Sequence, residues 1–104
     1  MNRLVICQWN CRSANSNREN LIHLLEDQKV DIALLSETRF KPGKYYNFHG
    51  YNIVRDDRFS VTVGGGSAIL INSNLYYEEV TMKVDFINVN KVAIKIKFKS
   101  YTVT

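Results

Sequence analysis

The organisation of the chain is clearest in residues 3–37, RLVICQWNCRSANSNRENLIHLLEDQKVDIALLSE. Two short apolar runs, residues 3–9 and 30–36, enclose a stretch with helical spacing. Both runs are rich in β-branched residues and lack alternation, which predicts strands that are covered on both faces. Between them, Ser16 and Glu19 have the spacing of a capping box, which predicts a helix that begins near Ser16 and ends at residues 27–29.

This order of strand, helix and strand predicts a βαβ unit with two parallel strands. Parallel strands end at the same edge of a sheet, and open α/β sheets bind their ligands at that edge. Asn10 and Glu37 directly follow the two strands. An amide and a carboxylate oxygen together suit Mg²⁺, which can polarise a phosphoryl oxygen and help to generate hydroxide from water. The structural alternative is that Asn10 caps its loop and Glu37 pairs with Arg39.

The loops after these two strands also carry basic and aromatic side chains. The basic residues are candidates for phosphate contacts, with solvated loop charges as the alternative: Arg12, Arg39, Lys41 and Lys44. Tyr45, Tyr46 and Phe48 follow, and they either stack on bases or pack over the sheet. His49 and His23 have no nucleophile or carboxylate partner nearby in the sequence, so neither is a strong candidate for a general base.

The remainder of the chain is rich in β-strand patterns. Residues 41–43 and Gly50 predict turns, and residues 56–65 predict a polar loop. Further strands are predicted at residues 51–55, 66–71, 80–86 and 92–98. A turn at residues 99–100 and a returning strand over residues 101–104 would follow, so we expect the chain to stop within a hairpin.

The composition is that of one globular domain of 104 residues with a net charge of +4. A hydrophobic content of 45% excludes a disordered tail, and two cysteines exclude a disulfide scaffold. Their CxxxC spacing, without further Cys or His pairs, does not indicate zinc; we expect a buried thiol at Cys7 and a loop thiol at Cys11. The sequence has no apolar run of membrane-spanning length and no signal peptide, so we expect an intracellular protein.

Four blocks of sequence together resemble the endonuclease/exonuclease/phosphatase family, and within it the apurinic-type endonuclease domains of jockey-like non-LTR retrotransposons. The blocks are QWNCRS (8–13), DIALLSET (31–38), GYNIVR (50–55) and GGSAILI (65–71). The resemblance implies the N-terminal half of a four-layered α/β sandwich, so that residues 1–104 would be a partial domain that lacks its C-terminal half. One sheet face would then be uncovered, and we expect an exposed apolar patch and self-association through it.

The resemblance also implies an activity and the residues that perform it. Members cleave phosphate esters with Mg²⁺ or Mn²⁺; Glu37 matches the metal-ligand Glu, and Asn10 matches the Asn that supports the catalytic centre. Arg12 departs from repair members, which carry an Asp there. The implied substrate is DNA, nicked in the nucleus to prime a reverse transcriptase that lies C-terminal in a full-length element.

The segments that supply the family's water-activating Asp and its His have no counterpart in this sequence, so we expect residues 1–104 to be inactive alone. The alternative is a non-catalytic relic that binds nucleic acid weakly through a basic strand, whose lysines otherwise form a solvated face: Lys91, Lys95, Lys97 and Lys99. A third reading is a phosphatase of the same family that acts on phosphoinositides or sphingolipids.

Overall fold

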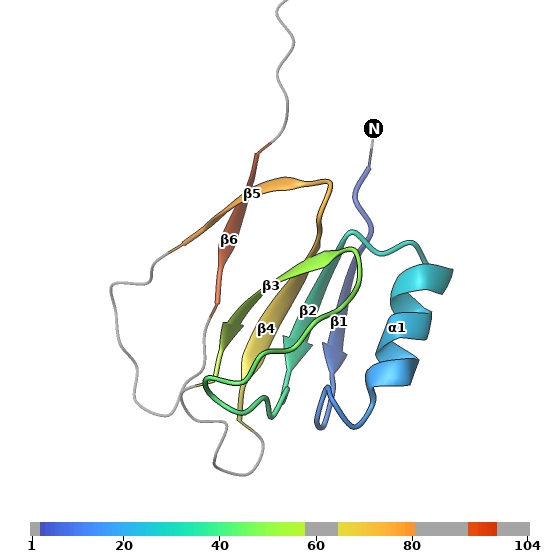
Figure 1. The fold of residues 1–104 in the computed structure, drawn as a ribbon. Helices are drawn as coiled ribbons and strands as arrows, with labels where there is room; N and C mark the ends of the chain where they lie inside the picture. Colours follow the sequence, from blue (N-terminus) through green and yellow to red (C-terminus); the bar gives the residue numbers. More distant parts are fainter. Residues whose placement is uncertain (1–2, 58–64, 81–91, 98–104) are drawn as a thin grey trace, which may run out of the picture.

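The computed structural model of the chain describes residues 3–57, 65–80 and 92–97, which form one helix and six strands (Figure 1). The predicted α/β class is confirmed, with a mixed sheet and a helix against it. Within these ranges, no helix has both the length and the apolar character needed to cross a membrane. The elements in chain order are β1 (Ile6–Asn10), α1 (Arg18–Asp27), β2 (Ile32–Ser36), β3 (Tyr51–Asp56), β4 (Ser67–Asn72), β5 (Tyr76–Glu79) and β6 (Ile94–Lys97).

The main sheet has the strand order β1-β2-β4-β3. Strands β1 and β2 are parallel, with Asn10 opposite Ser36, so the predicted βαβ unit is confirmed. Strand β4 is antiparallel to both of its neighbours and lies between β2 and β3, although β3 precedes it in the chain. Strands β1 and β3 are therefore the two edges of this sheet (Figure 1).

Helix α1 covers one face of the sheet. Leu21 and Leu25 are fully buried there, which confirms the expected apolar face of the helix. The predicted capping box is wrong: the helix begins at Arg18, and its N-cap residue is Asn17. The side chain of Asn17 does not cap the helix, because it is turned back toward the preceding loop. The core on this face also contains Cys11, Ala14, Val30, Ala33, Leu35, Phe40, Phe48, Ala68 and Leu70.

The opposite face of the sheet is partly covered by an antiparallel ribbon of β5 and β6. Residues 94–97 confirm the expected alternation, with the isoleucines toward the core and the lysines exposed. Strand β5 was not predicted, and the strand predicted at residues 80–86 falls almost entirely outside the described residues, as do the turn at 99–100 and the strand at 101–104. The ribbon packs against Ile32, Val54, Ile69 and Ile71.

Strand β1 is not covered on both faces, contrary to the sequence prediction. It is an edge strand, and its residues alternate between exposed and half-buried. Ile6 is 57% exposed, and Leu34 on the neighbouring strand is 39% exposed. In the parallel register both side chains lie on the face that carries the ribbon, because Ile6 pairs with Ile32 and Leu34 is two residues further along β2. Ile6 and Leu34 thus leave exposed apolar surface on this face of the sheet.

Candidate functional site

The sheet register aligns four strand ends in one row. Asn10 ends β1 and lies opposite Ser36, which ends β2 and precedes Glu37. Ser36 lies opposite Ser67 at the start of β4, and Ser67 lies opposite Asp56 at the end of β3. The two candidate residues therefore belong to neighbouring strand ends, as the βαβ unit predicts. Ser67 and Asp56 reach the same edge only because β4 is inserted between β2 and β3. The sequence pattern predicts a loop, not a strand, at Asp56.

Backbone hydrogen bonds join the loops that follow β1 and β2. The amides of Cys11, Ser13 and Ala14 donate to the carbonyl oxygens of residues 36, 37 and 38, each at 2.9 Å. These bonds continue the pairing of the two strands beyond the sheet. The backbone of Glu37 is therefore held directly against the loop that begins at Asn10.

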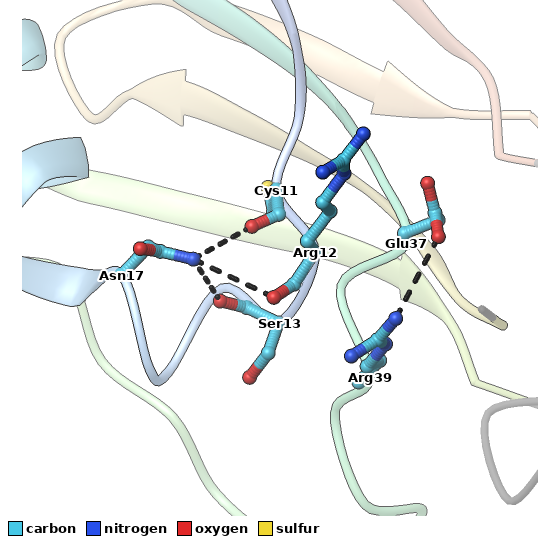
Figure 2. Close-up of polar contacts among 6 residues, drawn as sticks. All are labelled: Cys11, Arg12, Ser13, Asn17, Glu37 and Arg39. Carbon is cyan, nitrogen blue, oxygen red and sulfur yellow. Dashed lines mark hydrogen bonds and ion pairs between the residues drawn. The ribbon is translucent and has the colours of Figure 1, made fainter. Parts of the chain in front are cut away.

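Asn17 fixes the loop after β1 from within. Its side-chain nitrogen donates to the carbonyl oxygen of Cys11 at 2.8 Å, of Ser13 at 3.3 Å and of Arg12 at 3.5 Å (Figure 2). The side-chain amide of Asn17 thus supplies hydrogen bonds to backbone carbonyls of the turn, which lie beyond the paired part of β1. Sequence reasoning missed this role. The available signal was an asparagine next to the helix start, a residue type that often bonds to local backbone.

The two loops contain an unusual concentration of left-handed backbone. Four of the five non-glycine residues with positive φ in the described ranges are Arg12 (46°), Ser13 (84°), Glu37 (51°) and Arg39 (53°). Each such residue costs about 1–2 kcal/mol relative to the right-handed conformation. Strain of this kind clusters at functional sites, where the surrounding structure maintains it. Its location at Glu37 and its neighbours therefore points to this edge of the sheet.

The start of β4 locks the loop after β2 in place. Thr38 and Arg39 donate their backbone amides to the carbonyl oxygens of Gly66 (3.3 Å) and Gly65 (3.0 Å). Gly66 has a φ of 102°, and a Cβ atom placed on it would lie 2.3 Å from the hydroxyl oxygen of Thr38. Only glycine allows this close approach of the chain at Gly66 to Thr38.

Glu37 and Arg39 form an ion pair with 3.8 Å between the carboxylate oxygen Oε1 and the guanidinium nitrogen Nη2 (Figure 2). This is the structural alternative anticipated from the sequence. The Glu37 side chain is 29% exposed and that of Arg39 is 41% exposed, so solvent screens the pair and its contribution to stability is small. The Glu37 carboxylate consequently remains accessible to another cation that displaces Arg39.

The donor set at this edge fits a hard, weakly chelated cation. Mg²⁺ is commonly held by one or two protein oxygens, with water and substrate phosphate completing the shell. Glu37 supplies a carboxylate and Asn10 an amide oxygen from the adjacent strand end. The described part of the chain contains no group of three or more His, Cys, Asp or Glu side chains arranged to hold a metal. These residues therefore suit Mg²⁺ or Mn²⁺ better than a structural zinc.

All four candidates for phosphate contacts, Arg12, Arg39, Lys41 and Lys44, are exposed, and the first three lie nearest the sheet edge in the chain. Arg12 and Arg39 lie in the joined loops, and Lys41 follows two residues later. The backbone of Lys41 is fixed from both sides, because its amide donates to the Tyr46 hydroxyl at 3.0 Å and its carbonyl accepts from Arg55 at 3.0 Å. The structure thus places three cations on the segments at the sheet edge.

The cysteine assignments were reversed. Cys11 is 2% exposed although it lies in the loop, because the turn after β1 directs it into the helix-side core, whereas Cys7 on the edge strand is only half-buried. Burial raises the pKa of the Cys11 thiol from 9.0 to about 11, with smaller contributions from Cys7 and the negative charge of Glu37. Neither thiol is therefore a good nucleophile near neutral pH.

The basic strand is partly neutralised where the structure describes it. The Lys97 ammonium lies 3.1 Å from a Glu78 carboxylate oxygen, and Lys95 is opposite Glu78 in the register. The hydrogen bond and charge of Lys97, followed by the charge of Lys95, lower the pKa of Glu78. Lys91 and Lys99 lie outside the described residues. These pairs weaken the reading of this strand as a nucleic-acid-binding face.

Comparison with known proteins agrees with the fold. The model of the endonuclease/exonuclease/phosphatase family matches residues 7–99. The chain belongs to this family, whose members generally depend on divalent metals. It is also 32% identical over 78 residues to the RNA-directed DNA polymerase from mobile element jockey of Drosophila melanogaster. That alignment covers 75% of this chain and 8% of the relative, so the chain spans only a small part of the relative's length.

Proposed function

We propose that this chain contributes one corner of the active site of a metal-dependent DNA endonuclease that nicks target DNA during retrotransposition, within the nucleus. The observation that carries the proposal is the placement of Asn10 and Glu37 at adjacent parallel strand ends, in loops joined by three backbone hydrogen bonds. Family membership supports a divalent metal at this edge, and the likeness to part of a mobile-element polymerase supports a retroelement origin.

In this proposal Glu37 and Asn10 hold Mg²⁺ or Mn²⁺, which when bound supplies Lewis-acid polarisation of a phosphoryl oxygen. The exposed cations Arg12, Arg39 and Lys41 contact phosphate oxygens on either side of the scissile bond. Arg39 has a second role, because its ion pair orients the Glu37 carboxylate before the substrate arrives. The strained, hydrogen-bonded loops keep these groups in position without reorganisation during the reaction.

We also propose that residues 1–104 do not nick DNA on their own. In-line attack on phosphorus needs a group that activates water and donors that stabilise the developing charge. Both histidines lie away from the joined loops: His23 is exposed on α1, and His49 is in the turn before β3, at the opposite end of that strand from Asp56. In the family such groups come from segments without a counterpart in this sequence.

The metal site can be tested on the chain as it exists by adding substoichiometric Mn²⁺ and recording paramagnetic broadening of amide signals by NMR. We expect broadening at residues 10–13 and 36–39, and its loss in Glu37→Gln, which removes the charge but keeps the shape. Glu26→Gln, at an exposed position on α1, is the matched control and should broaden like the wild type. Broadening that persists in Glu37→Gln, or that maps elsewhere, contradicts the site.

Inactivity is tested separately with supercoiled plasmid and Mg²⁺. We expect the wild-type chain to leave the plasmid intact. Nicking that is lost in Glu37→Gln would contradict the proposed inactivity while supporting the site. The phosphatase reading has less support, because the relative found is a mobile-element polymerase. Release of phosphate from a phosphoinositide, dependent on Glu37, would favour that reading instead.

A further inference from the structure

An open groove lies beside β3, the edge strand farthest from β1 in the main sheet. One wall is formed by Tyr45, Tyr46 and Asn47 from the segment between β2 and β3. The other wall is formed by residues 51–53 and Arg55 of β3 itself. Its volume is about 290 Å³, close to the lower limit of about 300 Å³ for sites that bind small organic molecules.

The two tyrosines of the wall formed by residues 45–47 differ in how closely they are packed against the rest of the structure. The ring of Tyr46 is fixed, because it lies 4.2 Å from the ring of Phe40 and 5.0 Å from the guanidinium carbon of Arg55, and its hydroxyl accepts the Lys41 amide. Tyr45 is 82% exposed, so its ring contributes little to the core. The exposed ring of Tyr45 therefore lies at the rim of the groove, next to the fixed ring of Tyr46.

The polar groups around the groove suit a flat ligand with hydrogen-bonding edges. Asn47 is exposed on the wall formed by residues 45–47, and its amide group offers both donors and an acceptor. An aromatic face beside such an amide can stack on a planar heterocycle while the amide contacts its edge.

The charge of the surrounding segment selects an anionic ligand. Residues 38–55 include four cations and contain no Asp or Glu. Two of these cations are paired with flanking carboxylates, Arg39 with Glu37 at 3.8 Å and Arg55 with Asp57 at 2.6 Å. Lys41 and Lys44 therefore carry the positive charge that remains for a ligand. The Lys44 ammonium lies 5.7 Å from the centre of the Tyr46 ring, on the groove wall. Cations interleaved with an exposed aromatic ring are the combination that binds unpaired nucleotides, in which the base stacks and the phosphate meets the cation.

The groove lies along β3, whose end belongs to the same row of strand ends as the candidate metal site. Asp56 at the end of β3 belongs to the row of strand ends that contains Asn10 and Ser36, and Arg55 is the residue before it. Arg55 holds the carbonyl of Lys41, one of the candidate phosphate contacts. A strand of DNA that leaves the sheet edge past Lys41 therefore enters the groove at Arg55.

We propose that this groove binds an unpaired nucleobase of DNA held at the sheet edge, with the ring of Tyr45 stacked on the base and Lys44 near its phosphate. The inference deepens the proposed function, since it rests on DNA being the substrate. It adds a base-binding subsite to the metal corner formed by Asn10 and Glu37.

The test is the binding of a fluorescein-labelled oligothymidylate of twelve nucleotides to the chain, followed by fluorescence anisotropy at low salt. We expect Tyr45→Ala to raise Kd about fivefold or more, the lower range for loss of one base–aromatic stack. Tyr45→Phe keeps the ring and should bind within about twofold of the wild type. Tyr76→Ala is the matched control, because Tyr76 is 66% exposed on β5, outside the groove.

The salt dependence and the base requirement complete the test. Tyr45→Ala should leave the slope of log K against log salt unchanged, whereas Lys44→Ala should reduce its magnitude by about 0.7, because one phosphate contact is lost. An abasic oligomer of the same length should bind wild type as weakly as the oligothymidylate binds Tyr45→Ala. Three results would overturn the inference: no oligothymidylate binding by the wild type, an unaffected Tyr45→Ala, or equal binding of the abasic oligomer. The Mn²⁺ experiment at Glu37 is independent of all three results, so the proposed metal site at Asn10 and Glu37 can be supported or refuted separately.

Discussion

Replacement of Gly66 by alanine should destabilise the chain through one contact that the structure defines. The new Cβ atom would lie 2.3 Å from the hydroxyl oxygen of Thr38, 3.2 Å from the backbone nitrogen of Arg39 and 3.6 Å from the Cβ of Thr38. Thr38 is fully buried, and its branched side chain has little freedom to rotate away. The backbone at Gly66 has a φ of 102°, which alanine adopts only with strain.

The expected loss of stability is the sum of two terms. The backbone conformation costs about 1–2 kcal/mol for a residue that carries a Cβ. Forcing an atom into a filled space adds about 1–3 kcal/mol. We therefore expect Gly66→Ala to lower the free energy of unfolding by about 2–5 kcal/mol, a large fraction of the total for a domain of this size.

Urea denaturation followed by the fluorescence of Trp9, the single tryptophan, measures this loss. Gly43→Ala and Gly50→Ala are matched controls, since their φ angles are 78° and 83° but nothing lies within 4 Å of an added Cβ. They should show the backbone term alone. Adding Thr38→Ala to Gly66→Ala should recover part of the contact term, measured as a double-mutant coupling. Equal losses at Gly43 and Gly66, together with no recovery in the double mutant, would refute the steric argument.

Two further predictions concern the loop after β1. If Asn17 holds this loop through its amide donors, Asn17→Asp should lower the free energy of unfolding at least as much as Asn17→Ala, by about 1–3 kcal/mol, because a carboxylate would face carbonyl oxygens. Urea denaturation measures this loss. A stable Asn17→Asp variant would indicate that Asn17 acts as an ordinary helix cap instead. Because burial raises the pKa of Cys11 from 9.0 to about 11, the folded state holds this proton more tightly than the unfolded state. This contribution to stability is complete below about pH 9 and disappears as the pH rises through about 11. The difference between the urea midpoints of the wild type and Cys11→Ala should shrink over that interval, and a constant difference would contradict the assignment.

Much of the candidate site could be predicted from residues 3–37. The apolar runs and the helical spacing are local patterns, and the helical crossover between the two strands makes them parallel. Asn10 and Glu37 were therefore expected at the same edge of the sheet, and the register shows that their strands are neighbours. The roles of these two residues remain proposals that rest on this placement. The role of Asn17 was missed because helix starts and loops both favour short polar residues. The sequence does not show which backbone carbonyls a turn leaves without a regular partner.

Local sequence determined the class of the protein, the βαβ unit and the outward lysines of β6, because these depend on side-chain periodicity within one element. The tertiary structure alone decided that β4 lies between β2 and β3, that β1 is an edge strand, and that Cys11 rather than Cys7 is buried. It also decided the left-handed backbone at Glu37 and the approach of Gly66 to Thr38. These features depend on contacts between segments that are 11 to 39 residues apart in the chain, from Asp56 with Ser67 to Ile32 with Ile71. No pattern within either segment specifies the partner that it meets.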